Sequence, residues 1–372
     1  MRIAIIHDWI DTYRGGERVL EALAELYPNA PIYTLFYAPE KLPKGVRERF
    51  EKRDIRVVAG VNRFRRLRKL LLPFLPTYIE SIDLNEYDLI LSSSSCVAKG
   101  VIAAPDAKHI CYIHSPMRYV WDQRHEYFRG MGKIPFLSFF FNLIANYLRI
   151  WDFASSSRVD QFIANSCFVR ERIRKYYGRS AVVVPPPVEI ERFLNHVPGA
   201  KIDSEDYFLV AGAFVQYKRF DLAIKACEEI GHRLIVAGSG PLEKRLRQIA
   251  LGNTSFEIAP SAERWADLLA NCKALIFPGI EDFGIVPIEA MACGKPVIAY
   301  GVGGALDYVE PLVSGVFFKS QDVATLAGTL RGFRSETFDK SIIRQSIKKY
   351  KKEEFIKAIS TQIEQVIGVQ KV

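Results

Sequence analysis

Several features of metal-dependent and cofactor-dependent proteins are missing from this 372-residue sequence. None of its six cysteines forms a C-x-x-C pair or has a histidine at metal-ligand spacing, so neither a zinc site nor a disulfide framework is expected, and a reducing cytosol fits best. No D-x-D pair occurs, which argues against a divalent ion held by such a pair. The G-x-G-x-x-G fingerprint is absent after the first expected strand, so a dehydrogenase loses its main support.

Long hydrophobic runs are also scarce. The longest uncharged segment, residues 134–148, has fifteen residues and lies between Lys133 and Arg149. A helix needs about 20 apolar residues to cross a bilayer, so this segment is expected to be interfacial or part of the core. The first residues, MRIAIIHDW, have too short an apolar run for a signal peptide and predict a first strand.

Positive charge is concentrated in the first half of the chain. Residues 1–190 hold 28 Lys and Arg against 20 Asp and Glu, whereas residues 191–372 hold 23 against 22. The first half is therefore expected to meet an anionic partner: phospholipid, nucleic acid or a phosphorylated substrate. Its densest cluster, five cations in seven residues followed by the apolar stretch LLLPFLP, consists of Arg63, Arg65, Arg66, Arg68 and Lys69.

This basic cluster and the apolar stretch after it suit an anionic membrane surface. A nucleic-acid site would share the charge but would want interleaved aromatic residues, so no nucleic-acid partner is expected. The alternative is an ordinary solvated helix face. The membrane interpretation predicts a cytoplasmic protein bound peripherally to the inner face of the cytoplasmic membrane.

Short β-branched runs alternate with segments of helical period, which is typical of parallel sheets flanked by helices. Six candidate strands lie in the first half, at residues 3–6, 32–35, 89–92, 109–113, 162–164 and 181–184, and six in the second, at 208–211, 234–237, 256–259, 275–277, 297–299 and 316–318. The prolines at 185–187 cannot continue a strand or a helix. We therefore expect one α/β domain over residues 1–185 and another over 186–340, followed by an amphipathic helical segment over 341–372.

The segment EDFGIVPIEAMACGKPVIA contains two glutamates eight positions apart, Glu281 and Glu289. Pro287 is favoured in the first turn of a helix, so Glu289 is expected in that turn. The unpaired amides near Gly284 and Ile285, together with the helix dipole, predict an anion site suited to a diphosphate. Glu289 would then accept hydrogen bonds from a ribose diol, and Glu281 would reach a sugar hydroxyl. The alternative is that Glu289 only complements the dipole and Glu281 is solvated.

Further candidates lie in the first half. Gly15 and Gly16 follow the first strand, where glycines let the backbone approach a pyrophosphate closely; a plain turn is the alternative. His114 closes a strand before Ser-Pro, and the alternative to a functional role is a buried, hydrogen-bonded imidazole. Asp8 ends the first strand and is expected to contact an acceptor or a neighbouring loop.

These motifs resemble those of one family. EDFGIVPIEAMACGKPVIA is similar to the signature of the family 4 retaining glycosyltransferases, and YRGGERVLEAL, CYIHSPMRYVWD, FIANSCFVRERI, VAGAFVQYKRFDLAI and LIVAGSGP occur in the family's order. The HSPMRYVWD form is most similar to mannosyltransferases of bacterial O-antigen and exopolysaccharide assembly. The resemblance implies the GT-B fold: two Rossmann-like domains facing each other across a cleft, the first binding the acceptor and the second the nucleotide sugar, with C-terminal helices crossing back to the first.

The resemblance also implies roles for individual residues. Lys218 is expected to be the main cation for the donor diphosphate, with Arg219 beside it. His114 is expected to point into the cleft near the transferred sugar, with Arg118 as a further cleft candidate. Glu281 would position the sugar rather than attack it.

The chain departs from the family at one position. The family commonly has Gly-Arg where this sequence has Gly212-Ala213, so one phosphate-binding cation is missing. The expected activity is transfer of a hexose, mannose from GDP-mannose, to a lipid-linked or polysaccharide acceptor, without a metal or another cofactor. The alternatives are a GT-B sugar-nucleotide epimerase and a catalytically silent membrane-associated assembly factor, the latter suggested by Ala213.

Overall fold

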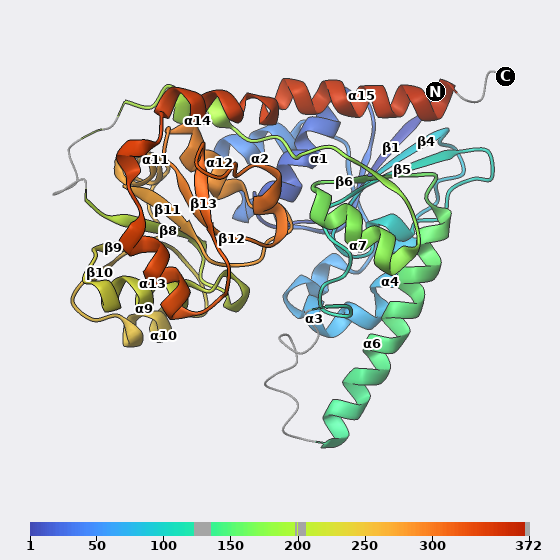
Figure 1. Cartoon of the computed structure of the whole chain (residues 1–372). Coiled ribbons are helices and arrows are strands. Elements are labelled where there is room, and N and C mark those ends of the chain that lie inside the picture. The colour runs from blue at the N-terminus through green and yellow to red at the C-terminus, as the bar shows by residue number, and fades with distance from the viewer. Residues whose placement is uncertain (123–134, 198, 200–205, 369–372) are drawn as a thin grey trace. The chain divides into compact units, whose positions relative to one another are not determined.

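The computed structural model describes residues 1–122, 135–197, 199 and 206–368 and divides the chain into two compact units (Figure 1). Unit 1 comprises Met1–Pro187 together with Glu353–Val372, and unit 2 comprises Val188–Lys352. The chain thus changes unit at the proline run. The segment expected over 341–372 is divided between the units, since its first part belongs to unit 2 and its last helix packs on unit 1.

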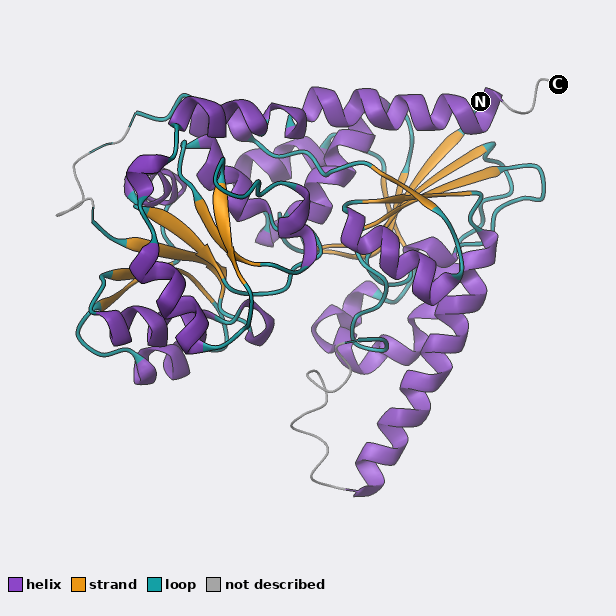
Figure 2. Ribbon diagram, in the orientation of Figure 1, coloured by secondary structure: helices purple, strands orange, loops and turns teal. Residues whose placement is uncertain are grey.

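In the described part of unit 1 the strands form a seven-stranded parallel sheet with the order β3-β2-β1-β4-β5-β6-β7. Figure 2 shows strands in orange and helices in purple. They are β1 (Ile3–Ile10), β2 (Ile32–Tyr37), β3 (Ile55–Val57), β4 (Leu89–Ser94), β5 (Lys108–Ile113), β6 (Gln161–Ala164) and β7 (Ala181–Val183). The inner strands are buried on both faces, as is usual for parallel sheets.

Helices cover both faces of this sheet because side chains alternate along each strand. Ile5 joins a core with α1 (Gly15–Leu26), α2 (Lys44–Glu51) and α15 (Lys352–Gly368), whereas Ala4 and Ile6 join a core with α4 (Leu75–Glu80) and α6 (Pro135–Ser155). The short helix α3 (Arg68–Leu71) precedes α4, and α7 (Cys167–Tyr177) packs on β5 and β6. The C-terminal helix α15 therefore completes the core of unit 1, as the resemblance implied.

Unit 2 repeats this plan. Its described strands form a six-stranded parallel sheet with the order β10-β9-β8-β11-β12-β13. They are β8 (Phe208–Ala213), β9 (Leu234–Ser239), β10 (Thr254–Ile258), β11 (Ala274–Phe277), β12 (Val297–Tyr300) and β13 (Gly315–Phe318). The helices are α8 (Ile190–Leu194), α9 (Phe220–Ile230), α10 (Glu243–Ile249), α11 (Ala262–Asn271), α12 (Ile285–Ala292), α13 (Val323–Gly332) and α14 (Lys340–Ser346). Two Rossmann-like units confirm the expected α/β class.

The strand order reverses once in each sheet, between β1 and β4 in unit 1 and between β8 and β11 in unit 2. At such a point the loops leaving two neighbouring strands turn to opposite faces of the sheet, and doubly wound sheets bind their ligands there. The loops after β8 and β11 carry Lys218 and Glu281, so the fold brings these two residues to the expected place for a ligand in unit 2.

Candidate functional site

Lys218 and Glu281 form an ion pair in unit 2. Lys218 ends the 3₁₀ turn η6 (Gln216–Lys218) after β8, and Glu281 lies in the loop after β11. The Nζ atom of Lys218 lies 2.5 Å from Oε1 of Glu281, and the two side chains are 10% and 16% exposed. The ion pair therefore holds each side chain in one position. Each side chain is still partly exposed, so a ligand can contact it.

Glycines let the loops that carry this pair pass close together. A Cβ atom on Gly279 would lie 2.7 Å from the Cα of Lys218, and one on Gly304 would lie 2.5 Å from the Cα of Phe283. The amide of Gly304 also donates a hydrogen bond to the carbonyl oxygen of Glu281 over 2.9 Å. Any larger residue at either glycine would push the Glu281 loop out of place.

The loop enters α12 through Gly284, whose φ of 89° is a left-handed conformation that suits glycine. A Cβ atom here would lie 2.7 Å from both Phe277 Cζ and the Tyr308 hydroxyl oxygen. The Tyr308 hydroxyl donates to the carbonyl of Phe283 over 2.9 Å, and burial raises its pKa far above the usual value, so it stays a donor. At Ile285 the helix begins, and its first amides lack acceptors within the helix.

The helix starts earlier than the sequence predicted. Because α12 begins at Ile285, Pro287 is its third residue and Glu289 its fifth. The prediction that Glu289 lies in the first turn is therefore wrong by one turn. Ile285 and its neighbour continue the helix toward the N-terminus because the left-handed Gly284, rather than the proline, sets the boundary.

Glu289 is buried, and its carboxylate contacts an aromatic donor that sequence reasoning missed. The indole Nε1 of Trp265 donates to Oε2 of Glu289 over 2.9 Å. Trp265 lies on α11, whose packing against α12 brings the two residues together. This contact fixes the orientation of the carboxylate. A lone tryptophan 24 positions earlier gave no signal for it in the sequence.

Arg219 directly follows Lys218 and caps α9 in a left-handed conformation, with φ 52° and ψ 39°. Its guanidinium donates to Asp221 and to the amide oxygen of Gln321, each over 3.2 Å. The amide nitrogen of Gln321 donates in turn to the carbonyl of Pro278 over 2.8 Å. Arg219 is thus tied to the loop that carries Glu281. Gln321 is a second residue that sequence reasoning missed.

The structure also shows what lies at the position where the family's arginine is missing. Ala213 ends β8, so its methyl group supplies no cation. Gly212 and Gly238 beside it have φ values of 137° and 135°, and a Cβ on Gly238 would lie 1.9 Å from the carbonyl oxygen of Gly212. These glycines keep the ends of β8 and β9 in close contact.

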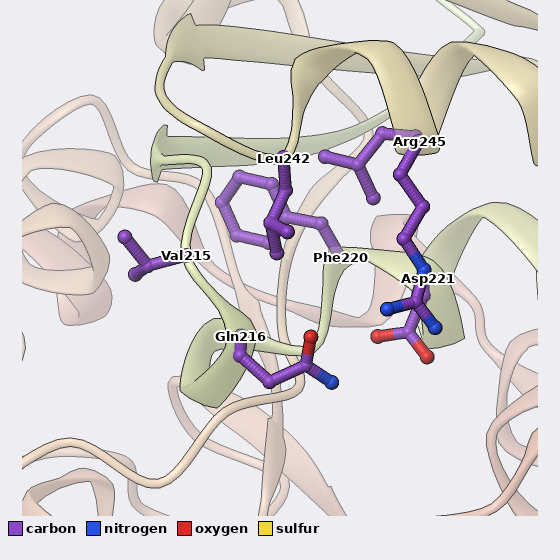
Figure 3. Close-up of a pocket in the computed structure, with 7 residues that line it drawn as sticks. Val215, Gln216, Phe220, Asp221, Leu242 and Arg245 are labelled. Carbon is purple, nitrogen blue, oxygen red and sulfur yellow. The ribbon is translucent and has the colours of Figure 1, made fainter. Parts of the chain in front are cut away.

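A hollow beyond η6 is too small to hold a nucleotide. It measures about 10 Å³ and is lined by Val215, Gln216, Phe220, Asp221, Leu242, Arg245 and Leu246. Figure 3 shows the Arg245 side chain reaching toward Asp221 across it. A single water needs about 10–15 Å³, so the hollow is a packing feature beside the Lys218 loop and not a ligand site.

In unit 1, a serine joins two histidines at the carboxyl edge of the sheet. Nδ1 of His7 lies 3.1 Å from Oγ of Ser93, and the same Oγ lies 2.8 Å from Nε2 of His114. Gly15 begins α1 and Gly16 follows, where a Cβ would lie 3.6 Å from His7 and 3.7 Å from His114. The predicted residues Gly16 and His114 therefore lie together, and Ser93 is an unpredicted member of the group.

Asp8 makes the loop contact that was one of its two predicted roles. It is 1% exposed and accepts hydrogen bonds of 2.6 to 3.1 Å from Ser95, Cys96, Val97 and Ala98. Four of these five bonds come from backbone amides. Both carboxylate oxygens are engaged in holding the turn after β4, so Asp8 belongs to the framework of the site.

Arg118 contacts Ser115, the residue that follows His114. Its Nε donates to Oγ of Ser115 over 3.3 Å, and the buried Arg172 donates to the same Oγ over 2.9 Å. Arg172 also pairs with Asp122 over 2.7 Å. Ser115, which follows His114, is thus held by two arginines.

The basic cluster is less uniform than its sequence suggests. Arg65 forms an ion pair with Glu40, and Arg68 pairs with Asp11 while stacking on Trp9 with its guanidinium 5.0 Å from the ring centroid. Arg63 and Arg66 are exposed, and the backbone of Lys69 lies in α3. Only part of the cluster's charge is thus directed to solvent. Among the described residues, no helix combines the length and the apolar character needed to cross a membrane.

Family models match both parts of the chain. Residues 13–192 match the model described as Glycosyltransferase Family 4, and residues 191–354 match the one described as Glycosyl transferases group 1. The chain therefore carries the two domain types of the GT-B glycosyltransferases, which is the class to which its fold also points.

Individual proteins to which the chain is similar share less than 30% sequence identity with it. The chain is 26% identical to the alpha-1,3/1,6-mannosyltransferase ALG2 of Kluyveromyces lactis, over 65% of this chain and 56% of the relative. It is 28% identical to the O-antigen chain mannosyltransferase C of Escherichia coli, over 34% of this chain and 35% of the relative. It is 29% identical to an uncharacterized glycosyltransferase of Methanocaldococcus jannaschii, over 40% and 42%. The matches span about half or less of these relatives.

Solved structures support the fold. Anabaena HepE, crystallised with UDP and glucose, superposes with a TM-score of 0.68 and 18% identity over 98% of this chain and 99% of its own. Sucrose-phosphate synthase from Thermosynechococcus elongatus gives 0.67 and 16% over 99% and 100%. At these identities the likeness concerns the fold alone, and it confirms GT-B.

Proposed function

We propose that the protein transfers a hexose, mannose from GDP-mannose, to a lipid-linked or polysaccharide acceptor, with retention of the anomeric configuration. The observation that carries the proposal is the fixed Lys218–Glu281 pair at the reversal point of the second sheet. A cation and a carboxylate side by side suit a ligand that presents a phosphate next to sugar hydroxyls. The mannosyltransferases among the relatives support mannose as the sugar.

In this proposal unit 2 holds the donor. Departure of a nucleoside diphosphate leaves negative charge on its β-phosphate, which must be stabilised where it develops. Lys218 and Arg219 place two cationic groups here, each already paired with a carboxylate, and the first amides of α12 after Gly284 add a partial positive charge. Glu281 accepts a hydrogen bond from a sugar hydroxyl, and Glu289, oriented by Trp265, accepts from the ribose diol. No metal is required for this charge balance.

In this proposal the anomeric configuration is retained because the acceptor hydroxyl attacks the sugar from the same face that the diphosphate leaves. The described residues around Glu281 offer a carboxylate already paired with Lys218, which suits it for positioning the sugar rather than for attacking it. The leaving phosphate oxygen takes the proton of the acceptor hydroxyl as the new glycosidic bond forms and the sugar–phosphate bond breaks. The products are the glycosylated acceptor and GDP.

Unit 1 holds the acceptor in this proposal, with His114 near the transferred sugar. The contact between Ser93 and Nε2 of His114 gives the imidazole one orientation, as a positioned hydrogen-bonding group requires. A lipid-linked acceptor also requires the protein to reach a membrane surface, and the exposed Arg63 and Arg66 support a peripheral contact with anionic lipid.

A thermal-shift screen tests the donor assignment. GDP-, UDP-, ADP- and dTDP-sugars are compared, because a ligand at 100 times its dissociation constant stabilises the folded state by about 2.7 kcal/mol. GDP-mannose should give the largest shift. A larger shift with a UDP-sugar would keep the glycosyltransferase proposal and change the donor, whereas no shift with any sugar nucleotide would favour the silent assembly factor.

A further inference from the structure

The outer face of α6 is apolar and exposed along most of the helix. Its exposed large side chains are Phe139, Phe140, Leu143, Tyr147, Ile150 and Phe153. Phe139, Leu143 and Ile150 are 61%, 50% and 62% exposed, and they recur at intervals of four and seven residues, which places them on one side of the helix. We call this set the outer face of α6. Such a continuous apolar face on a surface helix indicates a partner.

Charged groups are absent from this face over the described positions 139–157. The two charged residues between Phe139 and Ser157 are Arg149, which is half-buried, and Asp152, which is buried. The exposed polar positions are only Asn142, Asn146 and Ser157. A helix that faces water normally carries charges on its outer side, so the outer face of α6 is built to lie against an apolar medium.

The inner side of α6 anchors the helix firmly to unit 1. Asp152 forms a buried ion pair with Lys99 over 3.0 Å and accepts hydrogen bonds from Trp121 and Tyr177 over 2.7 and 2.9 Å. Ala145 and Leu148 pack into the core beside α4. In Figure 1 the amino-terminal turns of α6 extend beyond the sheet of unit 1. The carboxyl-terminal half of α6 is thus fixed to unit 1, and the apolar face runs along it.

The basic cluster borders the same helix. The 3₁₀ turn η3 (Leu72–Phe74), which follows α3, contacts α6, and Leu71 and Leu72 pack on its core side. The segment from Asn62 to Phe74 exposes further apolar side chains beside the exposed Arg63 and Arg66: Phe64, Leu67, Leu70 and Phe74. Residues 61–79 contain no acidic residue. Apolar side chains flanked by cations are the composition of a surface that binds anionic bilayers.

We propose that the outer face of α6 inserts into the acyl boundary of an anionic membrane, with Arg63 and Arg66 contacting the lipid headgroups. Anionic lipid fits better than a second copy of the chain. Two copies meeting here would bring their arginines together, and neither segment offers an exposed carboxylate to pair with them. The inference rests on the proposed function for its purpose, delivery of the enzyme to a lipid-borne acceptor, but its evidence is independent of the donor site.

Vesicle sedimentation of the full-length protein tests the inference. The parent should pellet with vesicles of phosphatidylglycerol and phosphatidylcholine. A variant with Phe140→Gln, Leu143→Gln, Tyr147→Gln and Ile150→Gln should partition at least tenfold less, with no change in net charge. A variant with Arg63→Gln and Arg66→Gln should bind anionic vesicles more weakly and with less dependence on salt, because fewer headgroup contacts remain to be screened.

Two further variants keep the test decisive. Asn142→Glu with Asn146→Glu adds charge to the outer face without removing an apolar contact, so it should release the protein from vesicles even if the glutamine variant folds poorly. Leu251→Gln with Ile342→Gln removes exposed apolar groups from unit 2 and should pellet like the parent.

Three results would overturn the inference. In the first, the parent does not bind anionic vesicles. In the second, the glutamate variant pellets like the parent. In the third, the parent is a dimer that dissociates in the glutamate variant, and vesicles have no effect. The thermal shift with GDP-mannose is measured on the same variants and should be unchanged. A lost vesicle signal with an intact donor shift thus separates failure of this inference from failure of the proposed function.

Discussion

Lys218 and Glu281 meet with 2.5 Å between Nζ and Oε1, each more than four-fifths shielded from solvent. At this depth neither charge can lose its partner without cost, because a shielded charge left alone has neither water nor a counter-ion. The pair thus holds both groups in the positions that a phosphate and a sugar hydroxyl need, before either ligand arrives.

Removing either member of this pair should nearly abolish transfer. Lys218→Met or Glu281→Gln removes about 3 kcal/mol of transition-state stabilisation, which lowers the rate on the order of a hundredfold. Each single variant should also lower the Tm, whereas the double variant should recover the Tm without recovering the rate, since no unpaired charge remains. The exposed pair Arg247–Glu243 is the matched control, and Arg247→Met with Glu243→Gln should change neither quantity. Parent-like turnover in Glu281→Gln would remove the site assignment.

Trp265→Phe should weaken donor binding while keeping the fold. The substitution removes the Nε1 donor to Glu289 and keeps most of the aromatic packing. A hydrogen bond to a charged group contributes about 1.5–3 kcal/mol, so calorimetry should show at least tenfold weaker GDP-mannose binding. Glu289→Gln should weaken binding similarly. Unchanged affinity in Trp265→Phe would mean that the indole does not orient the carboxylate.

Gly284→Ala should destabilise unit 2. The new methyl group would lie 2.7 Å from Phe277 and Tyr308, and alanine disfavours the φ of 89°. We expect the free energy of unfolding to fall by about 1–3 kcal/mol, which is measured as a lower Tm. Gly328→Ala is the control, because that glycine lies within α13 and a methyl group added there would have no heavy atom within 4 Å, so alanine should stabilise by about 0.5–1 kcal/mol. Equal Tm values for the two variants would mean that the loop entering α12 does not require a glycine at position 284.

Much of the fold could be predicted because most strands are marked by a short apolar run in the sequence itself. Runs such as those at residues 89–92 and 234–237 are apolar, short and bounded by turns, and each expected strand is present. The edge strand β3 was missed because Ile55–Val57 is three residues long and lies among charged residues. The start of α12 was misplaced because Pro287 is a weaker boundary signal than a left-handed glycine, whose φ the sequence does not reveal.

The candidate site was predictable in its residue types but not in its contacts. Glu281 and Lys218 were identified by motif, yet their pairing across 63 positions depends on the close approach that Gly279 permits. Ser93 and Trp265 gave no signal because only tertiary packing makes them partners of His114 and Glu289. The ion pair of Arg68 with Asp11 likewise neutralises one charge of the basic cluster, and only tertiary packing brings these two residues, 57 positions apart, together.

His109 should make stability depend on pH. It is fully buried with Nε2 2.7 Å from the Ser92 hydroxyl, and burial lowers its pKa to about 4. An unfolded histidine titrates near 6.5, so between these values the unfolded state binds more protons and stability falls as the pH drops from about 6.5 toward 4. The loss is on the order of 3 kcal/mol at the lower end. Denaturant titrations of His109→Leu should show a smaller loss of the free energy of unfolding between about pH 6.5 and 4 than the parent shows. An identical dependence on pH in parent and variant would mean that other groups cause the loss.

The most direct test of the proposed function is transfer from radiolabelled GDP-mannose to lipid-linked glycans of a bacterial membrane extract, run in EDTA. Label should enter the acceptor with release of one GDP per sugar, the chelator should leave the rate largely unchanged, and Glu281→Gln should lower the signal on the order of a hundredfold. Conversion of the sugar nucleotide without any acceptor would instead identify an epimerase. No release of GDP and no labelled product from GDP-mannose, with the protein folded and acceptor present, would rule out mannosyl transfer from this donor.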